Sequence, residues 1–259
     1  MCGIVGIIGT PNAAKESYLG LLMLQHRGQD SAGILSFNPK NLEFNFDKNL
    51  GHIKEALNEK TISETEAEMS IAHTRYSTIG KVRKEEIQPM FMSYPYGLGM
   101  VHNGNIINAS EVKTGLLSQK NRFVLTKNDL EVMMNIMAQS LSENETIAEF
   151  DKMQKAIQNI YDNIKGGYSL LSIIAGHGLL AAKDPNGIRP LVWGRRKLSQ
   201  KERELTLHNN EYAYAVASES NTLNFLGYDN IKEMQAGEIL YINEQGKIYN
   251  KKLKYSINE

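Results

Sequence analysis

Residues 1–9, MCGIVGIIG, combine an apolar run with the one cysteine of the chain. Residues 4–8 are continuously apolar apart from a glycine, which is the pattern of a short strand buried on both faces. Gly3 separates this run from Cys2, and a residue without a Cβ lets another group, such as a substrate, approach the backbone closely. The stretch predicts a core strand with a thiol at its start.

Cys2 is placed to act as an N-terminal nucleophile. A methionine that precedes a small residue is commonly removed in the cytosol, and its removal would leave Cys2 with a free α-amine. An α-amine titrates at about pH 8, so a fraction of it is neutral at physiological pH and can accept the thiol proton. The alternative is a small buried apolar residue at the start of a strand. The position beside Gly3 favours the nucleophile.

The order of elements predicts two packed sheets with helices outside. Thr10 and Pro11 are typical of a helix start, and Gly28 is typical of a helix end. Asn128 with Glu131 resembles a capping box, and the spacing of Thr146 and Glu149 repeats it at a second helix. Strands are expected on both sides of these two helices, without a regular βαβ repeat. The expected strands are 32–37, 42–46, 69–73, 98–102, 168–175, 178–183, 212–217 and 237–242, and residues 75–97 and 195–211 are expected to be a long loop and a hairpin excursion.

Composition excludes several classes of protein. The 259 residues carry 29 basic and 29 acidic side chains, and this balance argues against a nucleic-acid partner bound by phosphate neutralisation. No apolar run approaches the roughly 18 residues that span a bilayer, so no membrane partner is expected. A single cysteine excludes an intramolecular disulfide and a cysteine-rich zinc site, and it suits a reducing compartment such as the cytoplasm. No linker divides the chain, so residues 1–259 are interpreted as one domain.

Two further blocks carry groups suited to acyl chemistry. In VHNGNIIN (101–108), Asn103 and Gly104 follow an apolar strand, and an Asn-Gly turn can aim a side-chain amide and a backbone N–H at one oxyanion. The alternative is a hairpin turn, for which Asn-Gly is the commonest pair. Arg75, at the end of the strand in AHTRYSTIG (72–80), could bind a carboxylate in bidentate fashion or be an ordinary surface charge. Asp129, in the first turn of a helix, could bind an ammonium group or simply complement the helix dipole.

The histidines give no support to a metal site or a cofactor site. No two of His26, His52, His73, His102, His177 and His208 have the i,i+4 spacing of a helical metal site. The glycine pairs 97/99 and 176/178 do not follow a strand into a helix with phosphate-loop spacing. No metal and no cofactor are therefore expected.

Taken together, these blocks resemble the glutaminase domain of class II glutamine amidotransferases, which are N-terminal-nucleophile hydrolases. The resemblance runs from residue 1 to about 250, and Gln29, Tyr76 and Asn105 favour its purine-biosynthetic branch. The blocks are MCGIVGI at the start, QHRGQDSAGI (25–34), AHTRYSTIG (72–80), GMVHNGNIIN (99–108), KNDLEVMM (127–134), DPNGIRPLVWG (184–194) and ASES (217–220).

The resemblance implies an α+β, four-layer αββα sandwich of two packed antiparallel sheets with helices outside, and it assigns roles to named residues. Cys2 would be the nucleophile with its own α-amine as base, and Asn103 and the Gly104 N–H would form the oxyanion hole. The remaining implied contacts are Arg75 with the glutamine α-carboxylate, Asp129 and the Gly28 carbonyl with its α-ammonium, and Arg27 and Tyr76 as lining.

The resemblance also implies a partner. Ammonia released from L-glutamine would be supplied to a synthase or to a phosphoribosyltransferase subunit or domain, and a homo-oligomer is possible. Nothing in the sequence has the pattern of a phosphoribosyltransferase domain, which we expect to be absent from these residues. An alternative of another class is a non-catalytic glutamine-binding or scaffold module, which would not need Cys2, Arg75, Asn103 and Asp129 together.

Overall fold

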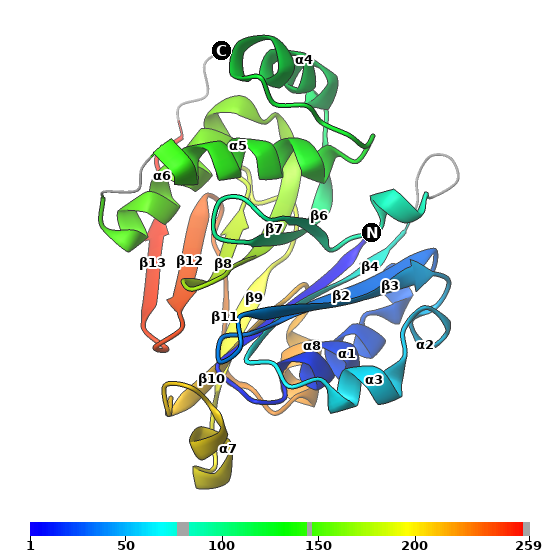
Figure 1. Cartoon of the computed structure of the whole chain (residues 1–259), viewed down its shortest axis with the longest axis vertical. Helices are drawn as coiled ribbons and strands as arrows, with labels where there is room; N and C mark the ends of the chain where they lie inside the picture. Colours follow the sequence, from blue (N-terminus) through cyan, green and yellow to red (C-terminus); the bar gives the residue numbers. More distant parts are fainter. Residues whose placement is uncertain (77–82, 144–146, 256–259) are drawn as a thin grey trace.

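Two β-sheets packed face to face form the centre of the protein, and helices cover the outer face of each sheet (Figure 1). The computed structural model describes residues 1–76, 83–143 and 147–255. Over these residues the arrangement is the expected four-layer αββα sandwich, so the predicted fold class is confirmed. The Thr146 position of the second expected cap lies outside the described residues.

The first sheet contains the strand that begins the chain. Its strands are β1 (Gly3–Ile8), β2 (Ser31–Asn38), β3 (Glu43–Leu50), β4 (Met69–Arg75), β9 (Val192–Lys197), β10 (Tyr212–Ala217) and β11 (Asp229–Glu233). Across the described residues their order is β11-β9-β10-β1-β4-β2-β3. All neighbouring pairs are antiparallel, and β1 lies between β4 and β10.

The second sheet is also antiparallel throughout. Its strands are β5 (Met90–Met92), β6 (Leu98–Ile106), β7 (Gly166–Ile174), β8 (Gly178–Lys183), β12 (Glu238–Asn243) and β13 (Ile248–Lys252). In the described part of the chain their order is β13-β12-β8-β7-β6-β5. Residues 198–211 of the predicted 195–211 excursion connect β9 to its antiparallel neighbour β10 in the first sheet, whereas residues 195–197 belong to β9 itself.

Each outer layer consists of helices whose apolar side chains face one sheet. The helices on the first sheet are α1 (Ala13–Met23), α2 (Ile53–Ala56), α3 (Glu59–Glu64) and α8 (Ser220–Phe225). Those on the second sheet are α4 (Ala109–Lys120), α5 (Asp129–Glu143) and α6 (Glu149–Asn163), while α7 (Gln200–Leu205) lies in the β9–β10 connection. Figure 1 shows the two helical layers on opposite sides of the sandwich.

The alternation of side chains along β1 explains why its apolar run is unbroken. Ile4 and Ile8 pack in the core between the sheets, whereas Val5 and Ile7 pack under the helices of the first sheet. Successive strand residues point to opposite faces, so a strand with a layer on each face needs apolar residues at every position. The predicted buried strand is confirmed, and it extends over Gly3–Ile8.

Local details differ from the sequence expectations at the two predicted helix starts that lie wholly within the described residues. Helix α1 begins at Ala13, because the Thr10 hydroxyl accepts the Asn12 N–H and the Ala13 N–H donates to the Ala67 carbonyl. Asn128 does cap α5 by accepting the Leu130 N–H at 3.0 Å. Glu131, however, accepts hydrogen bonds from the backbone of the preceding loop, so the reciprocal capping box is not formed.

The Asn103-Gly104 pair lies inside a strand and not in a turn. β6 continues to Ile106, and Asn103 and Gly104 pair with Ser169 and Tyr168 of β7. A Cβ on Gly104 would lie 2.5 Å from the Gly167 carbonyl oxygen. The glycine therefore serves the close approach of two strands, a requirement that a local turn pattern cannot reveal.

We predict opposite effects of the same substitution at two glycines. A Cβ on Gly33 of β2 would lie 2.2 Å from the Gln88 carbonyl oxygen, whereas a Cβ on Gly115 of α4 meets nothing within 4 Å. Gly33→Ala should destabilise the fold by about 1–3 kcal/mol through overpacking. Gly115→Ala should stabilise it by about 0.5–1 kcal/mol, because glycine is unfavourable inside a helix. Urea unfolding measures both, and effects of equal sign would contradict this packing.

Candidate active site

A polar pocket occupies one end of the space between the sheets. The side chains that fill this space are Ile4 and Ile8 on β1, Met69 and Ile71 on β4, and Val101 on β6. Successive strand residues point to opposite faces, so every second residue of a strand points into the same space. Counting by twos from these apolar residues gives the residues that extend the same faces past the apolar side chains. Those residues are Cys2, His73, Arg75 and Asn103, so three strands bring the predicted nucleophile and two of its predicted partners to one place.

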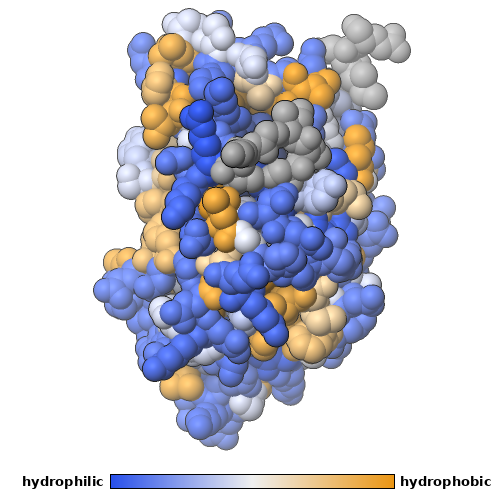
Figure 2. Space-filling model, turned by 90° about the vertical axis from the view of Figure 1, so that its right-hand side faces the viewer, coloured by the Kyte–Doolittle hydropathy of each residue, from blue (hydrophilic) through white to orange (hydrophobic). Residues whose placement is uncertain are grey.

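The pocket has a volume of about 310 Å³. Five of the eight predicted site residues line it, namely Cys2, Arg75, Tyr76, Gly104 and Asp129, whereas Asn103, Arg27 and Gly28 do not. The other lining residues are His73, Gln88, His102, Asn105, Ile106, Ala109, Lys127 and Asn128. The N-terminus lies at the right-hand side of Figure 1, and Figure 2 views the molecule from that side, where most of the visible surface is hydrophilic.

Contacts to the backbone hold the start of β1 in position. The Arg27 Nε donates to the Cys2 carbonyl at 3.0 Å, and its Nη1 donates to Glu219 at 2.6 Å. Ser218 accepts the Ile4 N–H through its hydroxyl, also at 3.0 Å. Arg27 is absent from the pocket lining, so in this structure it contacts the backbone of the nucleophile and not the pocket interior.

Gly3 has a packing role that the sequence did not predict. A Cβ at this position would lie 2.9 Å from the Leu24 Cβ and 3.1 Å from the Thr74 Cγ2. These atoms belong to the helix side of the first sheet, because Leu24 packs in the core beneath α1. The lack of a Cβ at Gly3 therefore makes room for the Leu24 side chain on the helix side of the first sheet, and the approach of a substrate to the Gly3 backbone stays a prediction.

The Cys2 thiol is held mainly in its protonated form. Burial raises the pKa of the Cys2 thiol above its usual value, and Asp129 contributes to the same direction. A hydrogen bond from the Tyr76 backbone, the N-terminal ammonium group and the Arg75 guanidinium act in the opposite direction without outweighing burial. The thiol therefore needs a nearby base before it can act as a nucleophile.

Arg75 and Asp129 place opposite charges in the pocket. The Arg75 Nη1 donates to the Glu86 carbonyl at 3.1 Å. Asp129, the first residue of α5, accepts the Ile106 N–H at 3.1 Å and lies 3.3 Å from the His102 Nε2. Burial opposes ionisation of Asp129, but His102 and the Ile106 N–H outweigh it, so the pKa of this carboxyl lies below its usual value. One end of the pocket is thus cationic and another anionic.

Asn103 supplies a buried amide with a free donor. The side chain is 2% exposed, and its Nδ2 has no hydrogen-bond partner among the described residues. Leaving a buried amide donor without a partner costs free energy of folding. The Asn103 Nδ2 is therefore a candidate donor to a bound ligand. The parity of β6 directs Asn103 to the face on which Cys2 also lies.

The remaining predicted contact, the Gly28 carbonyl, is already engaged. This oxygen accepts hydrogen bonds from the Gln25 Nε2 at 2.6 Å and from the Thr74 hydroxyl at 2.9 Å. Gly28 also does not line the pocket. A Cβ on Gly28 would lie 2.6 Å from the Arg75 backbone carbon, so its lack of a side chain allows the tight contact with the strand that carries Arg75.

Two lining residues were not singled out from the sequence. Gln88 lies in the expected loop 75–97, and His102 was considered only among the histidines that lack the spacing of a helical metal site. Both are almost fully buried, at 3% and 4% exposed, and they hydrogen-bond to each other. The only signal available beforehand was the polar character of His102 within an otherwise apolar strand.

No metal site is evident. In the part of the chain that the structure describes, no group of three or more His, Cys, Asp or Glu side chains could hold a metal ion. Among the same residues, no helix is long and apolar enough to cross a membrane.

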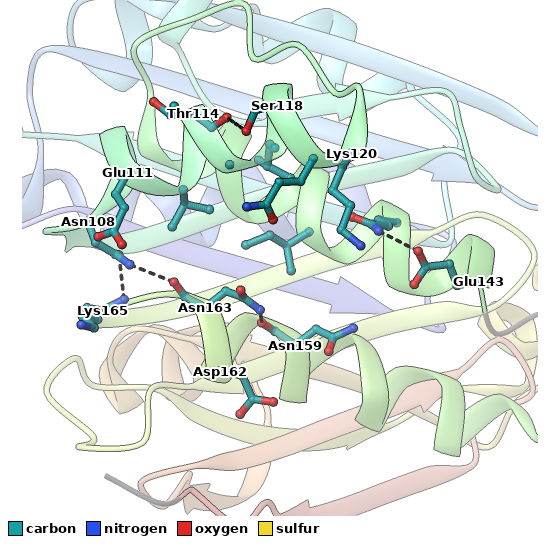
Figure 3. A pocket seen from close by; sticks show the side chains of 16 residues that line it. Asn108, Glu111, Thr114, Ser118, Lys120, Glu143, Asn159, Asp162, Asn163 and Lys165 are labelled. Carbon is teal, nitrogen blue, oxygen red and sulfur yellow. Dashed lines mark hydrogen bonds between the residues drawn. The ribbon is translucent and has the colours of Figure 1, made fainter. Parts of the chain in front are cut away.

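A larger groove of about 720 Å³ lies on the outside of the second helical layer, between α4, α5 and α6 (Figure 3). Its polar side chains bond mainly to the protein itself. Asn108 donates to the Asn163 carbonyl and accepts the Lys165 N–H, and Gln139 donates to Glu143. None of the predicted site residues lines this groove, so its size does not make it the site of the chemistry.

The sequence is similar to proteins of one family. The sequence model described as "Glutamine amidotransferase domain" matches residues 73–223. The amidophosphoribosyltransferase of Escherichia coli (strain K12) is 38% identical over 250 residues, which are 96% of this chain and 48% of that protein. The amidophosphoribosyltransferase of Schizosaccharomyces pombe is 36% identical over 95% of this chain and 45% of that protein. The chain spans about half the length of these curated relatives.

The fold is similar to solved structures that carry the same name or role. A glutamine phosphoribosylpyrophosphate amidotransferase from B. subtilis, complexed with ADP and GMP, matches with a TM-score of 0.78 and 28% identity, over 99% of this chain and 50% of that chain. A structure of the allosteric regulatory enzyme of purine biosynthesis matches with a TM-score of 0.79 and 29% identity over the same shares. The similarity therefore includes both sheets and both helical layers.

The raised pKa of the Cys2 thiol predicts an alkaline midpoint for its alkylation. In the chain that retains Met1, the rate of modification by iodoacetamide should rise with pH through a midpoint above that of the same chain unfolded in urea. The reason is that burial disfavours the thiolate only in the folded state. Because Cys2 is the one cysteine, intact-mass measurement follows it directly. A folded-state midpoint at or below the urea value would contradict this environment.

Proposed function

The chain belongs to the glutamine amidotransferase domain family, and from the geometry of its pocket we propose that it hydrolyses the side-chain amide of L-glutamine to glutamate and ammonia. The observation that carries this proposal is the convergence of a thiol, a guanidinium and a carboxylate in one pocket, beside the strand on which Asn103 holds an unpartnered buried amide next to the lining residues His102 and Gly104. We infer that the two sheets and their helices act as a single glutaminase domain.

The first step is attack of the Cys2 thiolate on the amide carbon of glutamine. Removal of Met1 would free the α-amine of Cys2, which takes the thiol proton and later gives a proton to the leaving nitrogen. The carbonyl carbon forms a bond to sulfur, its bond to nitrogen breaks, and ammonia leaves. Water, activated by the same amine, then attacks the γ-glutamyl thioester and releases glutamate and the free thiol.

The oxyanion of each tetrahedral intermediate needs donors that are already in place. We propose that the Asn103 Nδ2 and the Gly104 N–H supply them. A donor with no partner in the folded chain does not have to break a hydrogen bond before it binds the developing charge, and such preorganisation is the main source of oxyanion stabilisation.

The two charged side chains suit the two ends of the amino acid. We propose that Arg75 binds the α-carboxylate of glutamine and that Asp129 binds its α-ammonium. Tyr76, which is 56% exposed at the edge of the pocket, would cover the bound substrate. Arg27 and Gly28 would act through the protein backbone, Arg27 on Cys2 and Gly28 by permitting the approach of the Arg75 strand. A contact of the Gly28 carbonyl with the α-ammonium would require it to exchange one of its two donors.

The ammonia would serve a synthase or phosphoribosyltransferase subunit or domain, within purine biosynthesis. The names of the relatives support this assignment.

Glutamate release from glutamine by the purified protein tests the proposal. We expect turnover by chains that begin at Cys2, as found by intact mass, and stoichiometric modification by 6-diazo-5-oxonorleucine. Cys2→Ala should abolish both but retain glutamine binding, because the carboxylate and ammonium contacts remain. Binding without any turnover by the processed wild-type chain would favour a non-catalytic glutamine-binding module. Full activity with Met1 attached would exclude the α-amine as base.

Two substitutions should separate chemistry from binding. Asn103→Ala should lower kcat by about 100- to 1,000-fold, the usual cost of one oxyanion donor, with little change in KM. Asp129→Ala should mainly raise KM, because losing a charge-assisted contact in a desolvated site costs roughly 2–5 kcal/mol. Steady-state kinetics with glutamine give both parameters. An effect of Asn103→Ala on KM alone would remove it from the oxyanion hole.

A further inference from the structure

Gln88 makes a two-point contact with His102. The Gln88 Oε1 accepts the His102 backbone N–H at 2.8 Å, and its Nε2 lies 2.8 Å from the His102 Nδ1. The backbone N–H can only donate, so it requires the oxygen of the amide and turns the NH₂ group toward the ring. The His102 Nδ1 must then be an acceptor, without a proton.

This arrangement determines which ring nitrogen of His102 carries the proton. A neutral imidazole with an accepting Nδ1 has its proton on Nε2. The His102 Nε2 lies 3.3 Å from the Asp129 Oδ1, close enough for electrostatic attraction but without hydrogen-bond alignment. Contacts of this kind in unliganded sites often tighten when the substrate binds.

The backbone that carries Gln88 has little freedom to move. The Lys48 Nζ donates to the carbonyls of Ile87 and Pro89, both at 2.9 Å, and Gly33 packs directly against the Gln88 carbonyl. The side chain itself is 3% exposed. Gln88 is therefore anchored to β2 and β3 of the first sheet while its amide reaches β6 of the second.

The same segment also contacts the cationic end of the pocket. Two residues before Gln88, the Glu86 carbonyl accepts hydrogen bonds from the Arg75 Nη1 at 3.1 Å and from the Asn128 Nδ2 at 2.7 Å. Residues 86–88 thus touch Arg75 directly and reach Asp129 through His102. Residues 86–88 therefore help to set the position of the Arg75 guanidinium relative to the Asp129 carboxylate, the two groups that would bind the ends of glutamine.

We propose that Gln88 is a positioning residue, which fixes His102 in the Nε2-protonated tautomer so that the ring orients the Asp129 carboxylate toward the α-ammonium of glutamine. The inference rests on the proposed function for the identity of the ligand. It does not require Gln88 to touch substrate. With Oδ1 facing an N–H of His102 and Oδ2 accepting from Ile106, the carboxylate keeps its charge and one orientation.

Gln88→Glu tests this role with the smallest change of shape. The new carboxylate can still accept the His102 backbone N–H. Its second oxygen, when ionised, cannot donate a hydrogen bond to the His102 Nδ1. The ring must therefore either move its proton from Nε2 to Nδ1 or take up a second proton at Nδ1. We expect KM for glutamine to rise by about 10-fold or more, as when a histidine ligand loses its orienting partner, while kcat changes far less. Gln158→Glu makes the same change of charge on α6 and should leave both parameters unchanged.

A double-mutant cycle distinguishes positioning from general damage. On an Asp129→Asn background, Gln88→Glu should have no further effect on KM if it acts through Asp129. Gln88→Met, which offers His102 neither donor nor acceptor, serves as the second variant in case the carboxyl group introduced by Gln88→Glu takes up a proton and imitates the native amide. Thermal unfolding of each variant establishes that the protein is folded. An unchanged KM in both variants, or an equal loss on both backgrounds, would overturn the proposal.

The tautomer can be observed without any enzymatic activity. In ¹⁵N-histidine-labelled protein, long-range ¹H–¹⁵N spectra should show His102 protonated at Nε2, with the resonance assigned through a His102→Gln variant. Protonation of the wild-type ring at Nδ1 would overturn the inference even if glutamine is hydrolysed. Absence of turnover together with an Nε2-protonated His102 would instead count against glutamine hydrolysis and leave the Gln88 contact established.

Discussion

The antiparallel pairing of β1 with β4 on one side and β10 on the other is the constraint on which the rest of the structure depends. It holds the first residues of the chain in the middle of a sheet, although a chain terminus is ordinarily free to fray. Both faces of β1 are buried, by the second sheet and by α1. Cys2 is therefore held at a fixed position by the core that follows it.

The site exists because the side chains that face the space between the sheets change from apolar to polar toward one end. Where the strands carry Ile4, Met69 and Val101, it is filled by apolar side chains. Further toward one end, the same faces of the same strands carry Cys2, Arg75 and Asn103. This change needs no bend in the backbone, since alternate residues of a strand lie on the same face and each strand needs only a polar residue on that face at the end nearer the site.

Charge in this site is controlled mainly by groups that line the pocket. Asp129 keeps its ionised form against burial because His102 and a backbone N–H face it and hold its pKa below the usual value. The pKa of the Cys2 thiol lies above its usual value, because the Tyr76 backbone hydrogen bond and the nearby cations do not outweigh burial. The stretch 86–89 links these groups to the first sheet through Lys48 and Gly33.

The sequence by itself predicted the buried first strand and two packed sheets with outer helices, because apolar periodicity is a local property. The grouping of Cys2, Arg75, Asn103 and Asp129 into one site was predicted by the resemblance to class II glutamine amidotransferases. Only the tertiary structure decided what depends on a neighbour from elsewhere in the chain. Asn103-Gly104 has the local pattern of a turn, yet it pairs with β7. Gly3 makes room for Leu24, the Gly28 carbonyl is taken by two donors, and Gln88 meets His102 across the sheets. Each of these is a contact between distant residues, and the position of the second residue cannot be read from the pattern around the first.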